Sequence, residues 1–296
     1  MCQLRKLAST PLLKNMEEGM NDNFNLEKRM FNSSSIADYM GCPRLFYWGC
    51  VRKLELREQK ASISFGSAFH EALLVWYRTG NREEALKKFE VLPLVIEDDH
   101  RTRGWGEAIF KQYVEKYKME SGETLHLEVK FRVEIGERIY AGTMDRIEKW
   151  EGQIYVGDHK TTKMLGLSFF ESYRPSPQID GYCWATRELV GRCAGAIING
   201  ISVANNPKER FQRYISSRSN EEMDNWKEVF TDTTEDMERD VERKHFPMRT
   251  TYCNRWGKCK FWELCVYYQK DEVMREKFIE AQFKVKEEVK NEERKD

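Results

Sequence analysis

The sequence predicts an α+β fold in which helices flank a central mixed β-sheet. Two patterns support this class: the first half of the chain has apolar residues at helical spacing, and residues 125–161 alternate as strands do. The third observation is the composition, since 40% of the 296 residues are hydrophobic and 12% are aromatic. That content is sufficient for one large core or two modest ones, and it excludes a disordered or fibrous chain.

The elements of the first half are mostly helices. Residues 1–31 have no sustained period and are expected to form a flexible arm. Ser33, Ser34 and Ser35 are N-cap candidates for a short helix that ends near Cys42. Longer helical patterns follow at residues 65–78, 81–89 and 106–118.

The second half begins with a β-meander. Its expected strands are residues 125–135, 139–150 and 153–161. The expected elements that follow are a helix at 175–189, strands at 194–203 and 211–217, and a long polar helix at 220–244. Apolar residues in the charged tail after Val273 indicate an amphipathic helix. We therefore expect a flexible arm at 1–31, one main domain at 32–268 and a charged C-terminal helix at 269–296.

The charges cancel over the whole chain but not along it. There are 49 basic and 49 acidic residues, which excludes the overall basic excess of the simplest nucleic-acid binders. Residues 221–242 carry ten acids and two bases, whereas residues 243–260 carry six bases and no acid. The basic stretch is either a face for nucleic acid or a solvated surface. Without a membrane-spanning apolar run or an apolar signal core, we expect a cytoplasmic protein with no membrane partner.

Two aspartates mark the middle of the meander. If Trp150 pairs with Gln153 across a two-residue turn, the register places Asp145 opposite Asp158, with their Cβ atoms about 5 Å apart. Such like charges destabilise a hairpin unless a cation lies between them, and a divalent metal is the usual compensation. Strand alternation puts Lys160 on the same face. A purely structural network of two aspartates and a lysine would have the same pattern, so both interpretations stay open.

These residues carry a resemblance to a known family. Asp145 in GTMDR, followed by Asp158, His159 and Lys160 in GDHKTT, resembles the core of the PD-(D/E)XK nuclease superfamily, in its RecB-like branch. Three further matches stand in the family's chain order: Gly66 to His70 (Gly-x-x-x-His), Glu128 before the first aspartate, and Gln178 to Tyr182 (Gln-x-x-x-Tyr). The resemblance covers residues 33–268 and implies a restriction-endonuclease-like fold.

The resemblance implies a metal-dependent active site. Asp145, Asp158 and the backbone carbonyl of His159 would bind Mg or Mn, which would acidify a bound water. Lys160 would orient that water, and His70 would add a nitrogen ligand that favours Mn. A histidine on an apolar helix is otherwise most often a core residue. We assign no catalytic role to the ring of His159, which points to the opposite face.

Three more residues belong to the same expected site. Gln178 and Tyr182 are spaced i, i+4 and share one helix face, from which they could contact a carboxylate, a phosphate or a base. The alternative is the edge of an amphipathic helix. Glu128 is either a metal ligand or a surface charge of a strand.

The eight cysteines are unlikely to form disulfides in a cytoplasmic protein. Cys253, Cys259 and Cys265 are evenly spaced, and the best fourth ligand is Cys42, followed by Cys50. The gaps are long for a zinc knuckle and favour a 4Fe-4S cluster. Iron–sulfur relatives of the RecB-like branch, including the AddB nuclease domain and CRISPR-associated RecB-like exonucleases, carry one cysteine before the core and three after it. The cluster-binding segments would be 42–50 and 253–265 and would join the N- and C-terminal helical parts.

One departure from the family pattern and the buried thiols complete the description of the cysteines. The first gap of the trio is longer than in the family, which leaves zinc or an empty site as alternatives. Cys183 and Cys193, in apolar surroundings, are expected to fill the core.

Together these features predict a metal-dependent deoxyribonuclease, an exonuclease on single-stranded DNA ends, in DNA repair, recombination or phage- or CRISPR-type DNA processing. The expected cofactors are a 4Fe-4S cluster and Mg or Mn. Bases and aromatics near the cysteine trio suit strand binding: Arg255, Trp256, Lys258, Lys260, Phe261 and Trp262. No phosphate-binding GxxxxGK[ST] loop is present, so a helicase, recombination or CRISPR adaptation partner would supply unwinding. The alternatives are a non-catalytic DNA-binding subunit of a helicase-nuclease or recombination complex, and a zinc-stabilised interaction protein.

Overall fold

The computed structural model describes residues 24–94, 100–118, 122–255 and 257–286. The chain divides into two compact units. Among the described residues, unit 1 comprises Gln59–Phe131 and Thr143–Trp226, and unit 2 comprises the segments within Glu17–Glu58, Arg132–Gly142 and Lys227–Asp296. The first 23 residues of the expected arm lie outside the described residues. The expected division into arm, main domain and tail stays a prediction.

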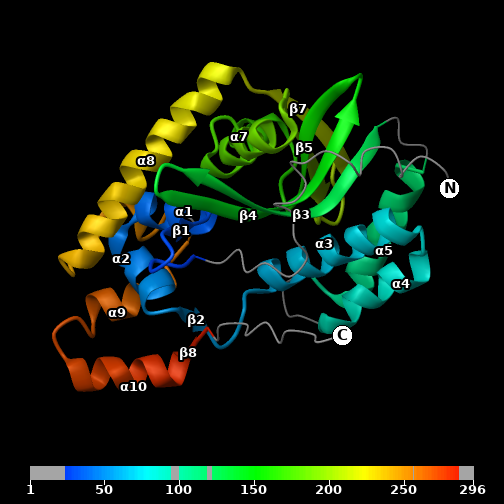
Figure 1. The fold of residues 1–296 in the computed structure, drawn as a ribbon. Helices are drawn as coiled ribbons and strands as arrows, with labels where there is room; N and C mark the ends of the chain where they lie inside the picture. Colours follow the sequence, from blue (N-terminus) through cyan, green and yellow to red (C-terminus); the bar gives the residue numbers. More distant parts are fainter. Residues whose placement is uncertain (1–23, 95–99, 119–121, 256, 287–296) are drawn as a thin grey trace, which may run out of the picture. The chain divides into compact units, whose positions relative to one another are not determined.

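The helical part of unit 1 is built around aromatic side chains. Its elements are α3 (Ala61–Thr79), α4 (Arg82–Leu86), the 3-10 helix η3 (Lys87–Val91) and α5 (Arg103–Lys116), which Figure 1 shows gathered together. They bury Phe65, Phe69, Phe89, Phe110 and Tyr113 against one another. The helices predicted in this region are therefore present, with α3 starting four residues earlier than the pattern indicated.

The sheet of unit 1 is mixed, as predicted. It contains strand β4 (Arg138–Trp150) from Thr143 onward, and strands β5 (Gln153–Thr162), β6 (Gly195–Ser202) and β7 (Phe211–Ser217). Strand β5 runs antiparallel to β4 and parallel to β6, and β6 runs antiparallel to β7. Strand β3 (Glu123–Ile135) also pairs with β4.

Two helices connect the parallel strands β5 and β6. They are α6 (Leu167–Glu171) and α7 (Pro177–Val190). Helix α7 begins at the N-cap Ser176, whose hydroxyl accepts the Ile179 N–H, and it packs on β5 and β6. Every residue of β6 is buried, as expected for a strand covered on both faces.

The predicted turn between β4 and β5 is confirmed. Glu151 and Gly152 have φ angles of 48° and 79°, as a two-residue hairpin turn with positive φ at both positions requires. Trp150 pairs with Gln153, and the register continues to Arg146 opposite Gly157.

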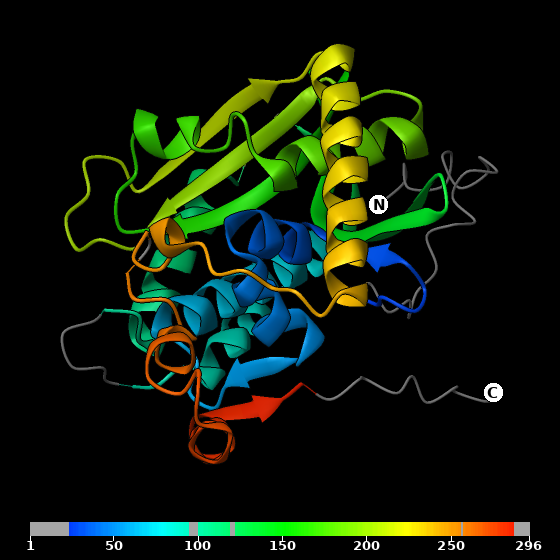
Figure 2. The ribbon, with the colours of Figure 1, turned by 90° about the vertical axis from the view of Figure 1, so that its left-hand side faces the viewer.

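Unit 2 has helices and short strands. The segments before unit 1 hold β1 (Met30–Phe31), α1 (Ser33–Gly41), α2 (Pro43–Phe46), η2 (Tyr47–Val51) and β2 (Leu54–Leu56). The later segments hold the larger part of α8 (Asn220–Glu242), η4 (Thr250–Tyr252), α9 (Trp262–Val266), α10 (Glu272–Gln282) and β8 (Phe283–Val285). Strand β1 runs parallel to β4, at Ile139 and Tyr140. Strands β2 and β8 pair antiparallel and lie side by side in Figure 2.

Two details of unit 2 differ from the sequence-based expectation. Asn32, and none of the three serines, caps α1: its side chain accepts the Ser35 N–H, while the Ser35 hydroxyl accepts the Asn32 N–H. The helix of the charged tail ends at Gln282 and is followed by β8, because Phe283 enters the core of the unit. No helix within the described ranges is long and apolar enough to cross a membrane.

Candidate active site and cysteine cluster

Asp158 and Lys160, both on β5, form a close ion pair within unit 1. Lys160 Nζ lies 2.8 Å from Asp158 Oδ2 and 3.0 Å from Oδ1. Burial opposes the charge of Lys160, but Asp158 outweighs it and raises the Lys160 pKa above its ordinary value. Burial also raises the Asp158 pKa, an effect that Lys160 opposes and Asp145 reinforces. The predicted placement of both side chains on one face of the strand is therefore confirmed.

Asp145 of β4 is held by two hydrogen-bonding partners. Its Oδ1 lies 3.1 Å from His70 Nδ1, and its Oδ2 accepts the backbone N–H of His159 at 2.7 Å. Burial alone would raise the Asp145 pKa, but His70 holds that pKa well below its ordinary value. Burial likewise opposes protonation of His70, yet Asp145 raises the His70 pKa.

The expected pairing of Asp145 directly opposite Asp158 is absent from the described register, which ends one residue earlier. The reason is local. The guanidinium of Arg146 lies 4.8 Å from the ring of Tyr77 on α3, and Asp145 contacts His70 on the same helix. Two consecutive side chains of β4 thus contact α3 where the described ladder between β4 and β5 ends.

A small pocket lies beside Asp145 and His70. It is lined by His70, Leu74, Tyr77, Leu127, Glu128, Asp145 and His159. Burial raises the pKa of Glu128, and the charges of Asp145 and Glu71 add to that rise. Glu128 has a φ of 49°, a left-handed conformation that a non-glycine residue adopts at a cost, often at a functional site.

The ring of His159 points away from Lys160, as predicted, and toward α3. It stacks on Tyr77, with 5.9 Å between centroids and 15° between planes, and lies 6.0 Å from the ring of His70. Its Nδ1 lies 2.7 Å from Nδ2 of Asn199 on β6. Burial lowers the His159 pKa well below its ordinary value, so the ring is neutral.

Gln178 and Tyr182 share one face of α7, as the spacing predicted. Gln178 Nε2 lies 3.3 Å from Tyr182 Oη, and Gln178 Oε1 accepts from Lys160 Nζ at 3.2 Å. Tyr182 is buried and packs edge-on against Phe131. This face of α7 is therefore hydrogen-bonded to the Asp158–Lys160 pair through Gln178.

The side chains of this site have the donor chemistry of a divalent-cation site but not its arrangement. In the part of the chain that the structure describes, no three His, Cys, Asp or Glu side chains are arranged to hold a metal ion. The protein's own basic side chains, His70 and Lys160, lie against the carboxylates instead. Asp158 Oδ2 is buried against the Lys160 ammonium, 2.8 Å away, and a carboxylate oxygen is a suitable ligand for Mg or Mn.

Four cysteines lie near one another in unit 2, although no three of them are arranged to hold a metal ion in the part of the chain that the structure describes. Cys42 and Cys265 are buried in one core, against which Cys259 packs. Cys42 Sγ accepts the Arg249 N–H at 3.3 Å, and the Cys259 N–H donates to the Cys253 carbonyl at 2.8 Å. Burial raises the pKa of Cys265 to about 11, and repulsion from the thiolates of Cys259 and Cys42 contributes to that rise.

The other cysteines have different neighbours. The charges around Cys50 are those of Asp38, Lys286 and Lys260, which favours Cys42 over Cys50 as the companion of the trio. Cys183 and Cys193 are buried in unit 1, as expected of core residues.

Sequence reasoning missed one residue beside Lys160. The Tyr173 ring centroid lies 5.9 Å from Lys160 Nζ. Tyr173 belongs to no motif, and its only sequence signal is its position shortly before Gln178.

Comparisons with known proteins identify the family of the chain and solved structures that are similar to it. A family model described as the PD-(D/E)XK nuclease superfamily matches residues 31–266, whereas no curated protein matches the chain. The crystal structure of a "putative exonuclease" from Eubacterium rectale is similar in fold, with a TM-score of 0.50 and 16% identity over 77% of this chain and 87% of its own. The crystal structure of SSO0001 has a TM-score of 0.32 and 13% identity, covering 79% of this chain and 93% of its own.

Proposed function

Because the chain belongs to the PD-(D/E)XK nuclease superfamily, we propose that it is a metal-dependent deoxyribonuclease of the RecB-like branch that degrades single-stranded DNA from its ends. The observation that carries the proposal is the meeting of Asp145, Asp158 and Lys160 at one buried place, with Lys160 paired to Asp158 at 2.8 Å. Phosphodiester hydrolysis needs carboxylates for a metal and a cation near the attacking water.

Each residue of the site has a proposed role. Asp145, Asp158 and the His159 carbonyl would hold Mg or Mn, with His70 as a nitrogen ligand. The bound metal would acidify a water and neutralise charge on the phosphate. Lys160 orients the attacking water and stabilises the negative charge that develops on the phosphate.

Two residues assist Lys160 and the pocket. Gln178 accepts a hydrogen bond from Lys160 and limits the directions that the ammonium can take. Glu128 lines the same pocket as His70 and Asp145, where a carboxylate would strengthen binding of a cation. Tyr182 is hydrogen-bonded to Gln178, and we propose that it holds Gln178 in position.

Basic and aromatic residues of unit 2 support a single-stranded substrate. Lys258 Nζ lies 4.5 Å from the ring centroid of Trp262, and the guanidinium of Arg255 lies 6.0 Å from that of Tyr252. Tyr267 is 66% exposed. Such pairs offer a ring face for a base and a charge for a phosphate. Of the residues expected to bind the strand, Trp256 lies outside the described residues.

We further propose that the four cysteines bind a 4Fe-4S cluster. The proposal rests on the proximity of Cys42 to the trio within one unit. Thiolates are the ligands that such clusters prefer. A helicase, recombination or CRISPR adaptation partner would supply unwound DNA.

The decisive experiment is a cleavage assay on protein purified without oxygen. End-labelled single- and double-stranded DNA is incubated with Mg or Mn, and the expected products are mononucleotides or short fragments from single strands. Asp158→Ala should abolish cleavage, whereas Asp224→Ala, a change of an exposed carboxylate on α8 of the same unit, should not. A wild-type protein that binds DNA but releases no product would contradict the nuclease assignment and favour a DNA-binding subunit.

The cysteine proposal has a separate readout. An iron–sulfur protein absorbs at about 400 nm, whereas a zinc protein does not. A single substitution of serine should remove this band and the bound iron at any of four positions: Cys42, Cys253, Cys259 and Cys265. Cys50→Ser should leave both unchanged, and full iron content in Cys42→Ser would contradict the ligand assignment.

A further inference from the structure

Asp158, Gln178 and Tyr173 lie around the Lys160 ammonium. Asp158 lies 2.8 Å away and Gln178 3.2 Å away, while the Tyr173 ring centroid lies at 5.9 Å. Asp158 precedes Lys160 on β5, but Gln178 and Tyr173 belong to a single short segment that leads into α7. The position of this segment therefore determines two of the three contacts.

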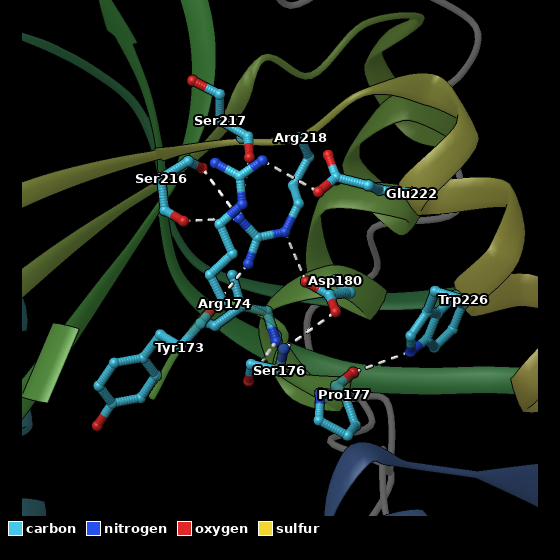
Figure 3. A network of polar contacts seen from close by, with 12 residues as sticks. Tyr173, Arg174, Ser176, Pro177, Asp180, Ser216, Ser217, Arg218, Glu222 and Trp226 are labelled. Atoms are coloured by element: carbon cyan, nitrogen blue, oxygen red, sulfur yellow. Dashed lines mark hydrogen bonds and ion pairs between the residues drawn. The ribbon is translucent and has the colours of Figure 1, made fainter. Parts of the chain in front are cut away.

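Arg218 ties that segment to the end of β7. Its side chain is 1% exposed. The guanidinium donates to the Tyr173 carbonyl at 2.6 Å and to Asp180 Oδ1 at 2.6 Å, as Figure 3 shows. The same guanidinium donates to the Ser216 hydroxyl at 2.6 Å. A buried arginine with this many short hydrogen bonds has little freedom to move.

Further bonds fix the start of α7. Asp180 Oδ2 accepts the Ser176 N–H at 3.0 Å, and Trp226 Nε1 donates to the Pro177 carbonyl at 2.9 Å (Figure 3). The backbone from Tyr173 to Pro177 is thus held at both ends. Rigid support of this kind is what a precisely placed side chain requires.

We infer that Tyr173 is a positioning residue for Lys160, and that Arg218 holds Tyr173 in place. The ring limits the space open to the ammonium and keeps Nζ directed at Asp158, and cation–π attraction adds to this restraint. The inference rests on the proposed role of Lys160 in cleavage. It adds a residue outside every motif of the sequence.

The test compares kcat and KM of three variants on the same single-stranded DNA. Tyr173→Leu removes the ring face and should lower kcat by roughly tenfold, with KM changed less than twofold. Tyr173→Phe keeps the ring and should restore kcat to within about twofold of wild type. Tyr214→Leu is the matched control, because Tyr214 stacks on Phe170, whose neighbour Phe169 packs on Tyr173. This change should leave kcat unchanged.

Three results would overturn the inference. They are an unchanged kcat in Tyr173→Leu, a loss confined to KM, and a loss in Tyr173→Phe as large as in Tyr173→Leu. A wild-type protein without activity would instead overturn the proposed function, so the two failures are distinguishable. Equal unfolding temperatures of Tyr173→Leu and Tyr214→Leu exclude a general loss of stability.

A double-mutant cycle tests the part played by Arg218. Arg218→Lys keeps a positive charge for Asp180 but cannot also donate to the Tyr173 carbonyl. Its kcat should fall in the wild-type background and change little in the Tyr173→Leu background. Losses that simply multiply would show that Arg218 does not act through Tyr173.

Discussion

Lys160→Ala should destabilise the protein much more than Asp158→Ala, although both remove one member of the same ion pair. The side chain of Asp158 is 3% exposed and that of Lys160 is 23% exposed. Without Lys160, a desolvated carboxylate loses its cation while Asp145 remains near it. Without Asp158, the ammonium still has Gln178 and partial contact with water, and repulsion between the two carboxylates is relieved.

The expected magnitudes follow from burial. Breaking a buried pair by removing one partner costs 3–5 kcal/mol, and the partial exposure of this pair reduces the cost of Lys160→Ala to about 2–3 kcal/mol. The unfolding midpoint should then fall by roughly 5–10 °C. Asp158→Ala should cost less than about 1 kcal/mol.

Thermal unfolding followed by circular dichroism, with EDTA present to exclude bound divalent metal, measures both variants. The double variant Asp158→Ala/Lys160→Ala should unfold close to Asp158→Ala, because it contains no unpaired buried carboxylate at this position. Equal midpoints for the two single variants, or a double variant as unstable as Lys160→Ala, would refute the reasoning.

Three further predictions concern other parts of the molecule. His70→Ala should reduce cleavage supported by Mn more than cleavage supported by Mg, since nitrogen ligands favour Mn; equal losses in parallel assays would indicate a packing role. Gly157→Ala should destabilise the protein by about 1–3 kcal/mol, because the added Cβ would lie 2.5 Å from Arg146 Cγ. Gly104→Ala is the control and should not destabilise the protein, because a Cβ at Gly104 meets open space. Denaturant unfolding compares the two variants. Glu238→Gln should destabilise by about 1 kcal/mol at pH 7, because its arginine partners outweigh burial and lower the carboxylate pKa below 4.5. This stabilisation is present above the ordinary pKa of the carboxylate and is lost as pH falls through its lower pKa in the folded protein. The unfolding temperatures of wild type and variant should therefore converge in acid. Unfolding temperatures that stay apart in acid would contradict the role of the Glu238 carboxylate.

The sequence predicted those features of the site that depend on local geometry. A two-residue turn fixed the register from Trp150 and Gln153 onward, and i, i+4 spacing placed Gln178 beside Tyr182. Strand alternation likewise paired Asp158 with Lys160. Each of these follows from the period of a single element or hairpin.

Features that depend on distant segments could not be predicted in this way. Asp145 is held by His70, 75 positions earlier in the chain. Tyr173 is fixed by Arg218, 45 positions later. At the start of α1, several polar residues could serve as the cap, and the reciprocal bonds between Asn32 and Ser35 decide among them.

Segments of the two units alternate along the chain, and this alternation determines when each cysteine becomes available to the others during synthesis. Cys42 and Cys265 belong to one core, yet the ribosome adds about 220 residues between them, which takes roughly 10–45 s at the usual rates of translation. During that interval the segments Gln59–Phe131 and Thr143–Trp226 of unit 1 are synthesised before the Cys42 thiol can contact Cys253, Cys259 or Cys265. For the proposed 4Fe-4S cluster, oxygen and iron supply during these seconds should therefore affect the yield of correctly assembled protein more than the same conditions applied after release.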